Sequence, residues 1–318
     1  MVWIFVAAAV VLLVPTVLFA VYRFTFYVLP AKRAEIYDLP RSGQYRPHLG
    51  EMKMLIDELA ARPYERVSVT AHDGVTLVGR YYHRADDAPL DICFHGYRGH
   101  AFRDFCGGSR ISIALGHNLL LVDQRGQGES GGRCMSFGIL ERQDCLAWLS
   151  WGEKRLGAVP TTLYGVSMGG ATVLMSAELD LPQQVRGIVA DCPYSDPLEI
   201  ICLVGRRWKL PVGLIRLLTI AAGRVFGGFD LRAASALTAL EKAKVPVLLI
   251  HGEDDRLVPC DMSRRLAQAC ASPVQLYTFS GAGHALSYLK DTALYEQVIL
   301  AFLRQVGVER REEKENKR

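Results

Sequence analysis

The chain has 318 residues, half of them hydrophobic, and a formal net charge of +4 at pH 7. This length accommodates one large domain with an appended segment. The small net charge, without any stretch that interleaves basic and aromatic residues, argues against a nucleic-acid-binding protein, so no nucleic acid is expected among its partners. The eight cysteines contain no C-x-x-C pair. We therefore predict scattered, buried thiols of a reducing compartment rather than a zinc site or a redox pair.

The first predicted element is an N-terminal membrane helix within residues 1–30. Arg23 is the only charged side chain of this segment, and about 20 apolar residues are enough to cross the ~30 Å core of a bilayer. No lysine or arginine precedes the apolar run, which argues against a cleavable signal peptide, and aromatic residues lie near both ends. We expect a retained single-pass anchor. Because the basic residues follow the span, the positive-inside rule places the rest of the chain in the cytoplasm.

Compact apolar strands and helices alternate after a connector at residues 31–63. The connector ends in a short amphipathic helix, and residues 66–83 alternate apolar and polar side chains around Asp73-Gly74, which predicts a hairpin. Further strands are predicted at residues 90–94, 118–122, 161–164, 185–190, 245–250 and 274–279, and helices at 102–115, 137–156, 168–179, 263–271 and 288–306. This pattern predicts an α/β fold with a mainly parallel sheet covered by helices on both faces, followed by a charged tail at 307–318.

Residues 197–240 interrupt the alternation. Their sequence is apolar and helical in character, and it is broken by Pro211 and by Gly227-Gly228. It carries more apolar residues than one packed helix face needs. Two interpretations remain open: the segment forms a hydrophobic acyl pocket, or it is a helix pair packed on the sheet.

The most informative motif is Gly165-Val166-Ser167-Met168-Gly169, which lies between a predicted strand and a predicted helix. A turn directly from strand to helix is crowded and strained, so it needs small residues on both sides of the serine. Such a turn presents the serine hydroxyl at the end of the sheet, and the helix N-terminus behind it favours developing negative charge. We therefore predict that Ser167 is a nucleophile.

A serine nucleophile needs a general base and a carboxylate that orients the base. In a parallel sheet, these groups are expected at the carboxyl ends of strands. His284 follows the last predicted strand, and Asp254 and Asp255 follow the strand before it. The chain order serine, aspartate, histidine is the order expected of an α/β-hydrolase. The pattern of residues alone does not separate Asp254 from its neighbour.

Five motifs together resemble the α/β-hydrolase superfamily. They are Gly165-Val-Ser-Met-Gly169, His95-Gly-Tyr-Arg-Gly99, Asp123-Gln-Arg-Gly-Gln-Gly-Glu-Ser130, His251-Gly-Glu-Asp-Asp-Arg-Leu-Val-Pro259 and Gly283-His284. The resemblance covers residues 64–306, and it is strongest to membrane-tethered serine-aminopeptidase-like and monoacylglycerol-lipase-like hydrolases. It implies an α/β-hydrolase fold in which residues 197–240 form a small helical cap over the active site.

The resemblance also implies a role for each site residue. Ser167 is expected to be the nucleophile and His284 the general base, and the family pattern His-Gly-x-x-Asp-x-x-Val-Pro selects Asp255 as the acid. The backbone N–H groups of Met168 and Tyr97 would form the oxyanion hole. No metal and no cofactor are implied.

Other polar residues near these motifs are expected to be structural. We expect His95 to brace its loop, Asp123 and Arg125 to stabilise a turn, and His100, His117 and His251 to take no part in the chemistry.

The sequence therefore predicts a membrane-anchored serine hydrolase that cleaves a carboxylic ester, thioester or amide bond through an acyl-enzyme. An apolar, lipid-derived acyl group is the expected substrate. An aminopeptidase-like serine peptidase is the nearest alternative, and it would need a carboxylate such as Glu199 or Asp230 to bind a charged N-terminus. A catalytically silent, membrane-bound interaction module is the second alternative. Because every motif follows the anchor, deleting the residues before about Lys32 should release a soluble, active domain.

Overall fold

The computed structural model of the chain describes residues 2–29, 39–40 and 43–308, with side chains from residue 12 onward. The first and last residues of the predicted anchor, part of the connector at 31–63 and most of the tail at 307–318 lie outside the described residues.

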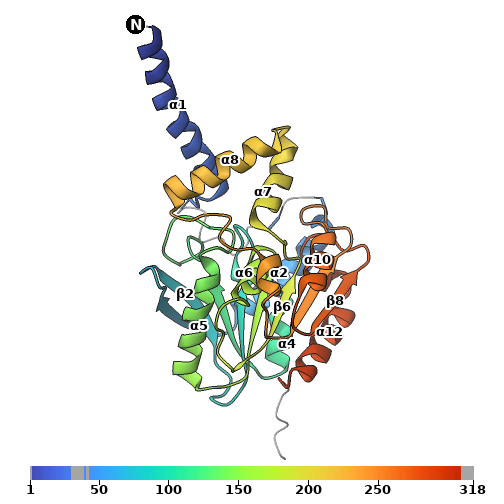
Figure 1. The fold of residues 1–318 in the computed structure, drawn as a ribbon. Helices are drawn as coiled ribbons and strands as arrows, with labels where there is room; N and C mark the ends of the chain where they lie inside the picture. The colour runs from blue at the N-terminus through green and yellow to red at the C-terminus, as the bar shows by residue number, and fades with distance from the viewer. Residues whose placement is uncertain (1, 30–38, 41–42, 309–318) are drawn as a thin grey trace, which may run out of the picture.

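An eight-stranded sheet in the order β1-β2-β4-β3-β5-β6-β7-β8 forms the centre of the domain (Figure 1). Its strands are β1 Glu65–Thr70, β2 Thr76–Tyr82, β3 Leu90–Phe94, β4 Asn118–Asp123, β5 Thr161–Val166, β6 Val185–Asp191, β7 Val247–Gly252 and β8 Val274–Phe279. The first two strands form the predicted hairpin, β2 runs antiparallel to β4, and all other neighbours are parallel. The predicted mainly parallel sheet is confirmed.

Helices cover both faces of this sheet, which explains why β3, β4 and β7 are buried along their whole length. One hydrophobic cluster joins the sheet to α5, α6 and α10, and the other joins its opposite face to α2, α3 and α12. Successive side chains of a strand alternate between the two clusters, so that Ile92 lies in the first and Cys93 in the second. The covering helices are α2 Leu49–Ala60, α3 Ala101–Phe105, α4 Ser109–Ala114, α5 Glu141–Leu156, α6 Met168–Ser176, α10 Asp261–Ala269, α11 Ser287–Lys290 and α12 Thr292–Gln305.

Three predicted helices are shorter or divided in the structure. The helix expected at 102–115 is broken between α3 and α4, where Gly107 lies so close to the Tyr288 ring that a Cβ would not fit. The helix expected from residue 137 begins at Glu141, because Phe137 has a positive φ of 55°. The closing helix is divided at Asp291, whose side chain accepts a hydrogen bond from the Leu294 N–H and thereby caps α12.

The segment at 197–240 leaves the sheet at the carboxyl end of β6 and lies over that end of the domain, as α7 and α8 in Figure 1 show. Asp196 caps its first helix. The segment comprises α7 Pro197–Gly205, the 3-10 turn η3 Arg206–Trp208, α8 Val212–Ala222, the π-helical turn η4 Gly223–Gly227 and α9 Ala236–Leu240.

The N-terminal helix α1 Val2–Thr25 packs against α8 and then runs away from the domain (Figure 1). Phe19 and Tyr22 of α1 contact the Phe226 ring, with centroid distances of 5.4 and 5.8 Å. Part of the apolar surface of the 197–240 segment is therefore covered by α1. Among the residues whose side chains the structure describes, from residue 12 onward, no helix is both long and apolar enough to cross a membrane.

The residues just after α1 are built into the domain. Phe26 is fully buried and packs edge-to-face on Phe137 and Phe229. The Met135 N–H donates to the Phe26 carbonyl at 2.8 Å, and Tyr27 forms an isolated β-bridge with Cys134. The end of the N-terminal segment is thus part of the hydrophobic core.

Candidate active site

Ser167 lies in a strained turn between β5 and α6. Its φ is 55° and its ψ is −114°, a conformation that an L-residue adopts only when its surroundings enforce it. A Cβ on Gly165 would overlap the Gly169 carbonyl, and a Cβ on Gly169 would overlap the Phe94 carbonyl. Both glycines are therefore required by close backbone contacts, and the Ser167 N–H is held by the Asp191 carbonyl at 2.8 Å.

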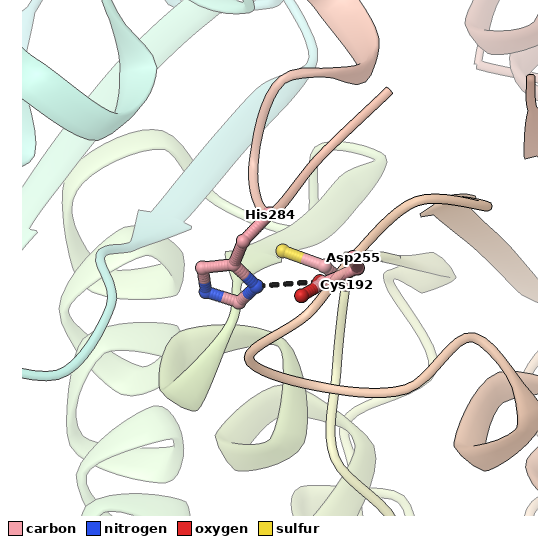
Figure 2. A group of neighbouring side chains, drawn as sticks. All are labelled: Cys192, Asp255 and His284. Carbon is pink, nitrogen blue, oxygen red and sulfur yellow. Dashed lines mark hydrogen bonds and ion pairs between the residues drawn. The ribbon is translucent and has the colours of Figure 1, made fainter. Parts of the chain in front are cut away.

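The structure brings together the three residues that the sequence singled out as a triad. His284 Nε2 lies 2.9 Å from Ser167 Oγ, and His284 Nδ1 lies 2.6 Å from Asp255 Oδ2. Figure 2 shows the contact between His284 and Asp255, which come from the turns after β8 and β7. The neighbouring Asp254 is exposed, and its backbone N–H bonds the Ala282 carbonyl. The geometry thus allows a proton to pass from the hydroxyl to the imidazole.

The Asp255 carboxylate is buried but well supplied with donors. Its Oδ1 accepts hydrogen bonds from the Leu257 and Val258 N–H groups, both at 2.8 Å. Burial by itself would raise the pKa of Asp255, but hydrogen bonds from His251 and His284, together with the charge of His284 and the Val258 N–H, hold it well below its usual range. Asp255 is therefore ionised and can fix the orientation of the imidazole.

His251 takes a place that the sequence analysis did not assign to it. Its Nε2 lies 3.4 Å from Asp255 Oδ2 and 2.9 Å from the Val258 carbonyl, and its Nδ1 contacts Ser263 Oγ at 2.6 Å. The residue expected to be a bystander thus adjoins the acid of the triad. The sequence contains one indication of this contact, because His251 is the first residue of the motif that contains Asp255.

Cys192 lies beside the imidazole and the carboxylate (Figure 2). The thiol, one oxygen of Asp255 and one nitrogen of His284 all lie within 4.8 Å of one another, a grouping that a metal ion could use. Burial raises the pKa of the Cys192 thiol well above its usual range, helped by the negative charges of Asp191 and Asp255. Metals bind the thiolate, and His284 Nδ1 is already engaged with Asp255. The arrangement therefore fits a hydrogen-bonded histidine beside a neutral thiol better than a metal centre.

The two predicted oxyanion donors flank Ser167. Met168 is the first residue of α6, so its N–H has no acceptor within the helix. Tyr97 follows Gly96, and a Cβ on Gly96 would lie 3.4 Å from the Cβ of Ser167. Within the part of the chain described, no hydrogen bond engages the N–H of Tyr97 or of Met168.

Polar residues behind these loops make structural contacts. His95 Nε2 accepts a hydrogen bond from the Gln124 N–H, which fits its expected bracing role. Arg80 and Asp123 form a buried ion pair at 2.9 Å. Arg125 binds Asp144 at 2.5 Å and Asp73 at 2.7 Å. His100 caps α3, and His117 pairs with Asp91 at 3.0 Å.

A cavity of about 1200 Å³ opens beside Ser167 and His284. Its apolar wall comes from the connector, from α3 and α4, and from α11 with the turn before it. It includes Leu39, Met52, Phe105, Ile111, Leu286 and Leu289. The apolar residues of α7 and α8 do not line it. Of the two interpretations left open for residues 197–240, the acyl pocket gains no support from this lining, to which the segment contributes Arg207. Leu198, Ile201 and Ile215 are instead buried in the main core.

The connector contributes directly to this site. Tyr45 is buried, and its hydroxyl donates to the His284 carbonyl at 2.7 Å. Gln44 packs on Gly283. The two carboxylates proposed for a peptidase lie elsewhere: Glu199 pairs with Arg265 at 2.7 Å, and Asp230 pairs with Arg224 at 2.5 Å. Neither lines the cavity.

Comparison with known proteins matches this chain to two family models. Residues 92–241 match the family model described as the alpha/beta hydrolase fold, and residues 223–291 match the model of serine aminopeptidase, S33. The Bacillus subtilis protein YqkD is 30% identical over 197 residues, which are 61% of this chain and 64% of YqkD. The lysophosphatidylserine lipase ABHD12 of Danio rerio is 23% identical over 215 residues, or 61% of this chain and 52% of that protein.

These matches support an α/β-hydrolase superfamily hydrolase. Among solved structures, the esterase Pf2001 of Pyrococcus furiosus has a TM-score of 0.63 and 22% identity, and the match covers 78% of this chain and 94% of that chain. This likeness shows a shared fold. The chain spans less than two thirds of YqkD and about half of ABHD12.

Proposed function

We propose that the protein is a serine hydrolase whose catalytic residues are Ser167, His284 and Asp255. The proposal rests on two consecutive hydrogen bonds. Ser167 Oγ lies 2.9 Å from His284, and His284 lies 2.6 Å from Asp255. The strained φ of 55° at Ser167 supports it, because strain of this kind is retained where a function requires it.

The reaction would proceed through an acyl-enzyme. Ser167 Oγ attacks the carbonyl carbon while His284 Nε2 accepts the hydroxyl proton, and Asp255 stabilises the imidazolium. The N–H groups of Met168 and Tyr97 stabilise the oxyanion. His284 then gives its proton to the leaving group, which departs as an alcohol, thiol or amine. Water attacks the acyl-enzyme with the same base, and the acid is released with the serine restored.

An ester of an apolar acyl group is the substrate class that we favour. The apolar side chains around the cavity beside Ser167 support it. Two similar proteins are consistent with this substrate class. One relative is described as a lysophosphatidylserine lipase, and one protein of similar structure as an esterase. A lipid-derived ester, with thioester or amide as chemical variants, fits both.

We also propose that α1 anchors the protein in a membrane as a single-pass span, with the hydrolase domain in the cytoplasm. The sequence of residues 2–22 is free of charge. Leu12, Leu13 and Phe24 project apolar side chains into solvent, and Leu12 is 72% exposed. Lipid would cover such surface, and the basic residues that follow the helix support the orientation.

Labelling with a fluorophosphonate probe tests the proposed nucleophile. The full-length protein should be labelled with a stoichiometry of one, and the Ser167→Ala protein should not be labelled or hydrolyse p-nitrophenyl esters. The Ser68→Ala protein is the matched control, because Ser68 is exposed on β1. Equal labelling of the Ser167→Ala protein would disprove the triad.

A peptidase is the second candidate, and the match of residues 223–291 to the serine aminopeptidase model favours it. Glu199 and Asp230 are both ion-paired away from the cavity. Neither of these two carboxylates can therefore bind the amino group of a peptide substrate. Turnover of aminoacyl p-nitroanilides faster than of p-nitrophenyl esters would favour the peptidase. Failure to label at all would favour a silent interaction module.

A further inference from the structure

The N-terminal segment contacts the loop that carries one of the proposed oxyanion donors. The Tyr97 hydroxyl donates to the Thr25 carbonyl at 2.9 Å. Arg98 Nη2 donates to the Phe24 carbonyl at 2.7 Å and to the Tyr27 carbonyl at 3.3 Å. Two consecutive side chains of the loop are therefore bound to the last turn of α1 and the residues after it.

These acceptors are held firmly. Phe26 is fully buried, its carbonyl accepts from the Met135 N–H, and the Val28 N–H donates to the Arg133 carbonyl at 3.1 Å. The carbonyls of Phe24 to Tyr27 thus belong to a segment that cannot shift without disturbing the core.

The rest of the loop is fixed from other directions. The Gln124 side-chain amide donates to the His95 carbonyl, and Asp104 Oδ2 accepts from the Gly96 N–H at 2.7 Å. Beyond Gly96, the Gly99 N–H donates to the Gly96 carbonyl at 3.0 Å and closes the turn. The contacts that tie this turn to another segment of the chain are those of the Tyr97 and Arg98 side chains. Arg98 has a positive φ of 48°, a conformation that costs free energy and needs outside contacts to persist.

We propose that the side chains of Tyr97 and Arg98 are positioning residues that use the end of α1 to hold the Tyr97 N–H at the oxyanion. The inference rests on the proposed serine-hydrolase function. The N–H itself is the group that touches the substrate, and the phenol and guanidinium act only through the backbone. Because α1 is the proposed membrane anchor, the end of this helix contributes to the catalytic rate, and the apolar residues before it locate the protein.

The test compares the purified full-length Tyr97→Phe, Arg98→Ala and wild-type proteins in detergent micelles. Tyr97→Phe removes one oxygen and keeps the ring that packs on Phe137. We expect kcat for a p-nitrophenyl ester to fall about tenfold in each variant while KM changes by less than about twofold, because a loosened donor weakens binding of the transition state and not of the ground state. Tyr81→Phe is the matched control, since it removes a buried hydroxyl bonded to Asn118 on the sheet, and it should keep the wild-type kcat.

A second readout separates positioning from a general loss of structure. The ratio of the rate for an ester to the rate for its thionoester, in which sulfur replaces the carbonyl oxygen, reports on the oxyanion site. This ratio should fall in the Tyr97→Phe and Arg98→Ala proteins and stay unchanged in the Tyr81→Phe protein. Wild-type kcat and wild-type ratio in both loop variants would overturn the inference. Activity that survives Ser167→Ala would instead overturn the proposed function, so the two failures are distinguishable.

Discussion

Asp254 and Asp255 are adjacent in the sequence but have different surroundings. Asp255 receives two backbone N–H groups and His284, and its pKa lies well below its usual range because these donors outweigh its burial. Asp254 is exposed to solvent. At the scale of single residues, the fold therefore decides which of two identical side chains can orient the imidazole.

This difference predicts unequal effects on the rate. Asp255→Asn should lower kcat by about 10⁴, because an amide cannot hold the imidazole in the productive tautomer. Asp254→Asn should change kcat by less than about twofold. Steady-state kinetics on ester substrate, with circular dichroism as a check of folding, measures both effects. If the Asp254→Asn protein is the inactive one, the acid has been assigned to the wrong residue.

Asp191 predicts a pH dependence of stability. Burial raises its pKa to about 6, although His251 and a hydrogen bond from Tyr295 oppose the shift. An unfolded aspartate titrates near 3.9, so between about pH 4 and 6 the native state holds a proton that the unfolded state has lost. The contribution of Asp191 to the free energy of unfolding is therefore fully present below pH 4. It is lost as the pH rises to 6, and the loss is on the order of 3 kcal/mol.

The Asp191→Asn protein should not lose stability in this way as the pH rises, because asparagine does not ionise. Its free energy of unfolding, measured by urea titration, should rise relative to that of the wild type by about 3 kcal/mol between pH 4 and 7. A difference that stays constant over this range would contradict the raised pKa.

At the scale of elements, the turn from β5 to α6 depends on backbone atoms in close contact. The space beside Gly169 is filled by the Phe94 carbonyl of β3, and the space beside Gly165 by the Gly169 carbonyl. Where β3, β5 and α6 meet, the space beside each of these two glycine Cα atoms therefore holds only a hydrogen atom. This turn directs Ser167 toward His284.

Gly169→Ala should therefore be severely destabilising. The new methyl group would overlap a backbone carbonyl that cannot rotate away, and we expect a loss of about 3 kcal/mol or more together with loss of fluorophosphonate labelling. Gly213→Ala in α8 is the matched control, because nothing lies within 4 Å of its Cβ position, and it should gain about 0.5–1 kcal/mol. Thermal unfolding of both proteins checks the contrast; a normally stable Gly169→Ala protein would contradict the packing argument.

At the scale of the whole molecule, the N-terminal segment and the hydrolase domain share one hydrophobic core. Tyr22, Phe26 and Val28 are buried in the main core, and Tyr45 of the connector holds the His284 loop. All five motifs follow the anchor, but the residues from Tyr22 onward complete the core. We therefore expect that a deletion of every residue before Lys32 weakens the domain.

Two deletions test this expectation. A protein lacking residues 2–20 keeps the buried part of the N-terminal segment, and it should leave the membrane fraction with the kcat of the full-length protein. A protein lacking residues 2–31 should lose at least about tenfold in kcat and unfold at a lower temperature, because it removes both the acceptors of the Tyr97 loop and several buried side chains. Equal activity of the two proteins would show that the domain is complete without this segment.

The sequence by itself determined the features that depend on neighbouring residues. The periodicity of β3 and of the hairpin, the glycines around Ser167 and the order of Ser167, Asp255 and His284 are all patterns within a few residues or in chain order. These patterns predicted the parallel sheet, and they identified the three residues that the structure brings within hydrogen-bonding distance.

Only the tertiary structure decided which distant segments complete the site. The contact of Tyr45 with His284 joins residues 239 positions apart, and that of Tyr97 with Thr25 joins residues 72 positions apart. Cys192 and His251 reach the triad because β6 and β7 are neighbours in the sheet. Local propensity and periodicity do not encode such pairings, because they follow from the order of the strands and the packing of whole elements.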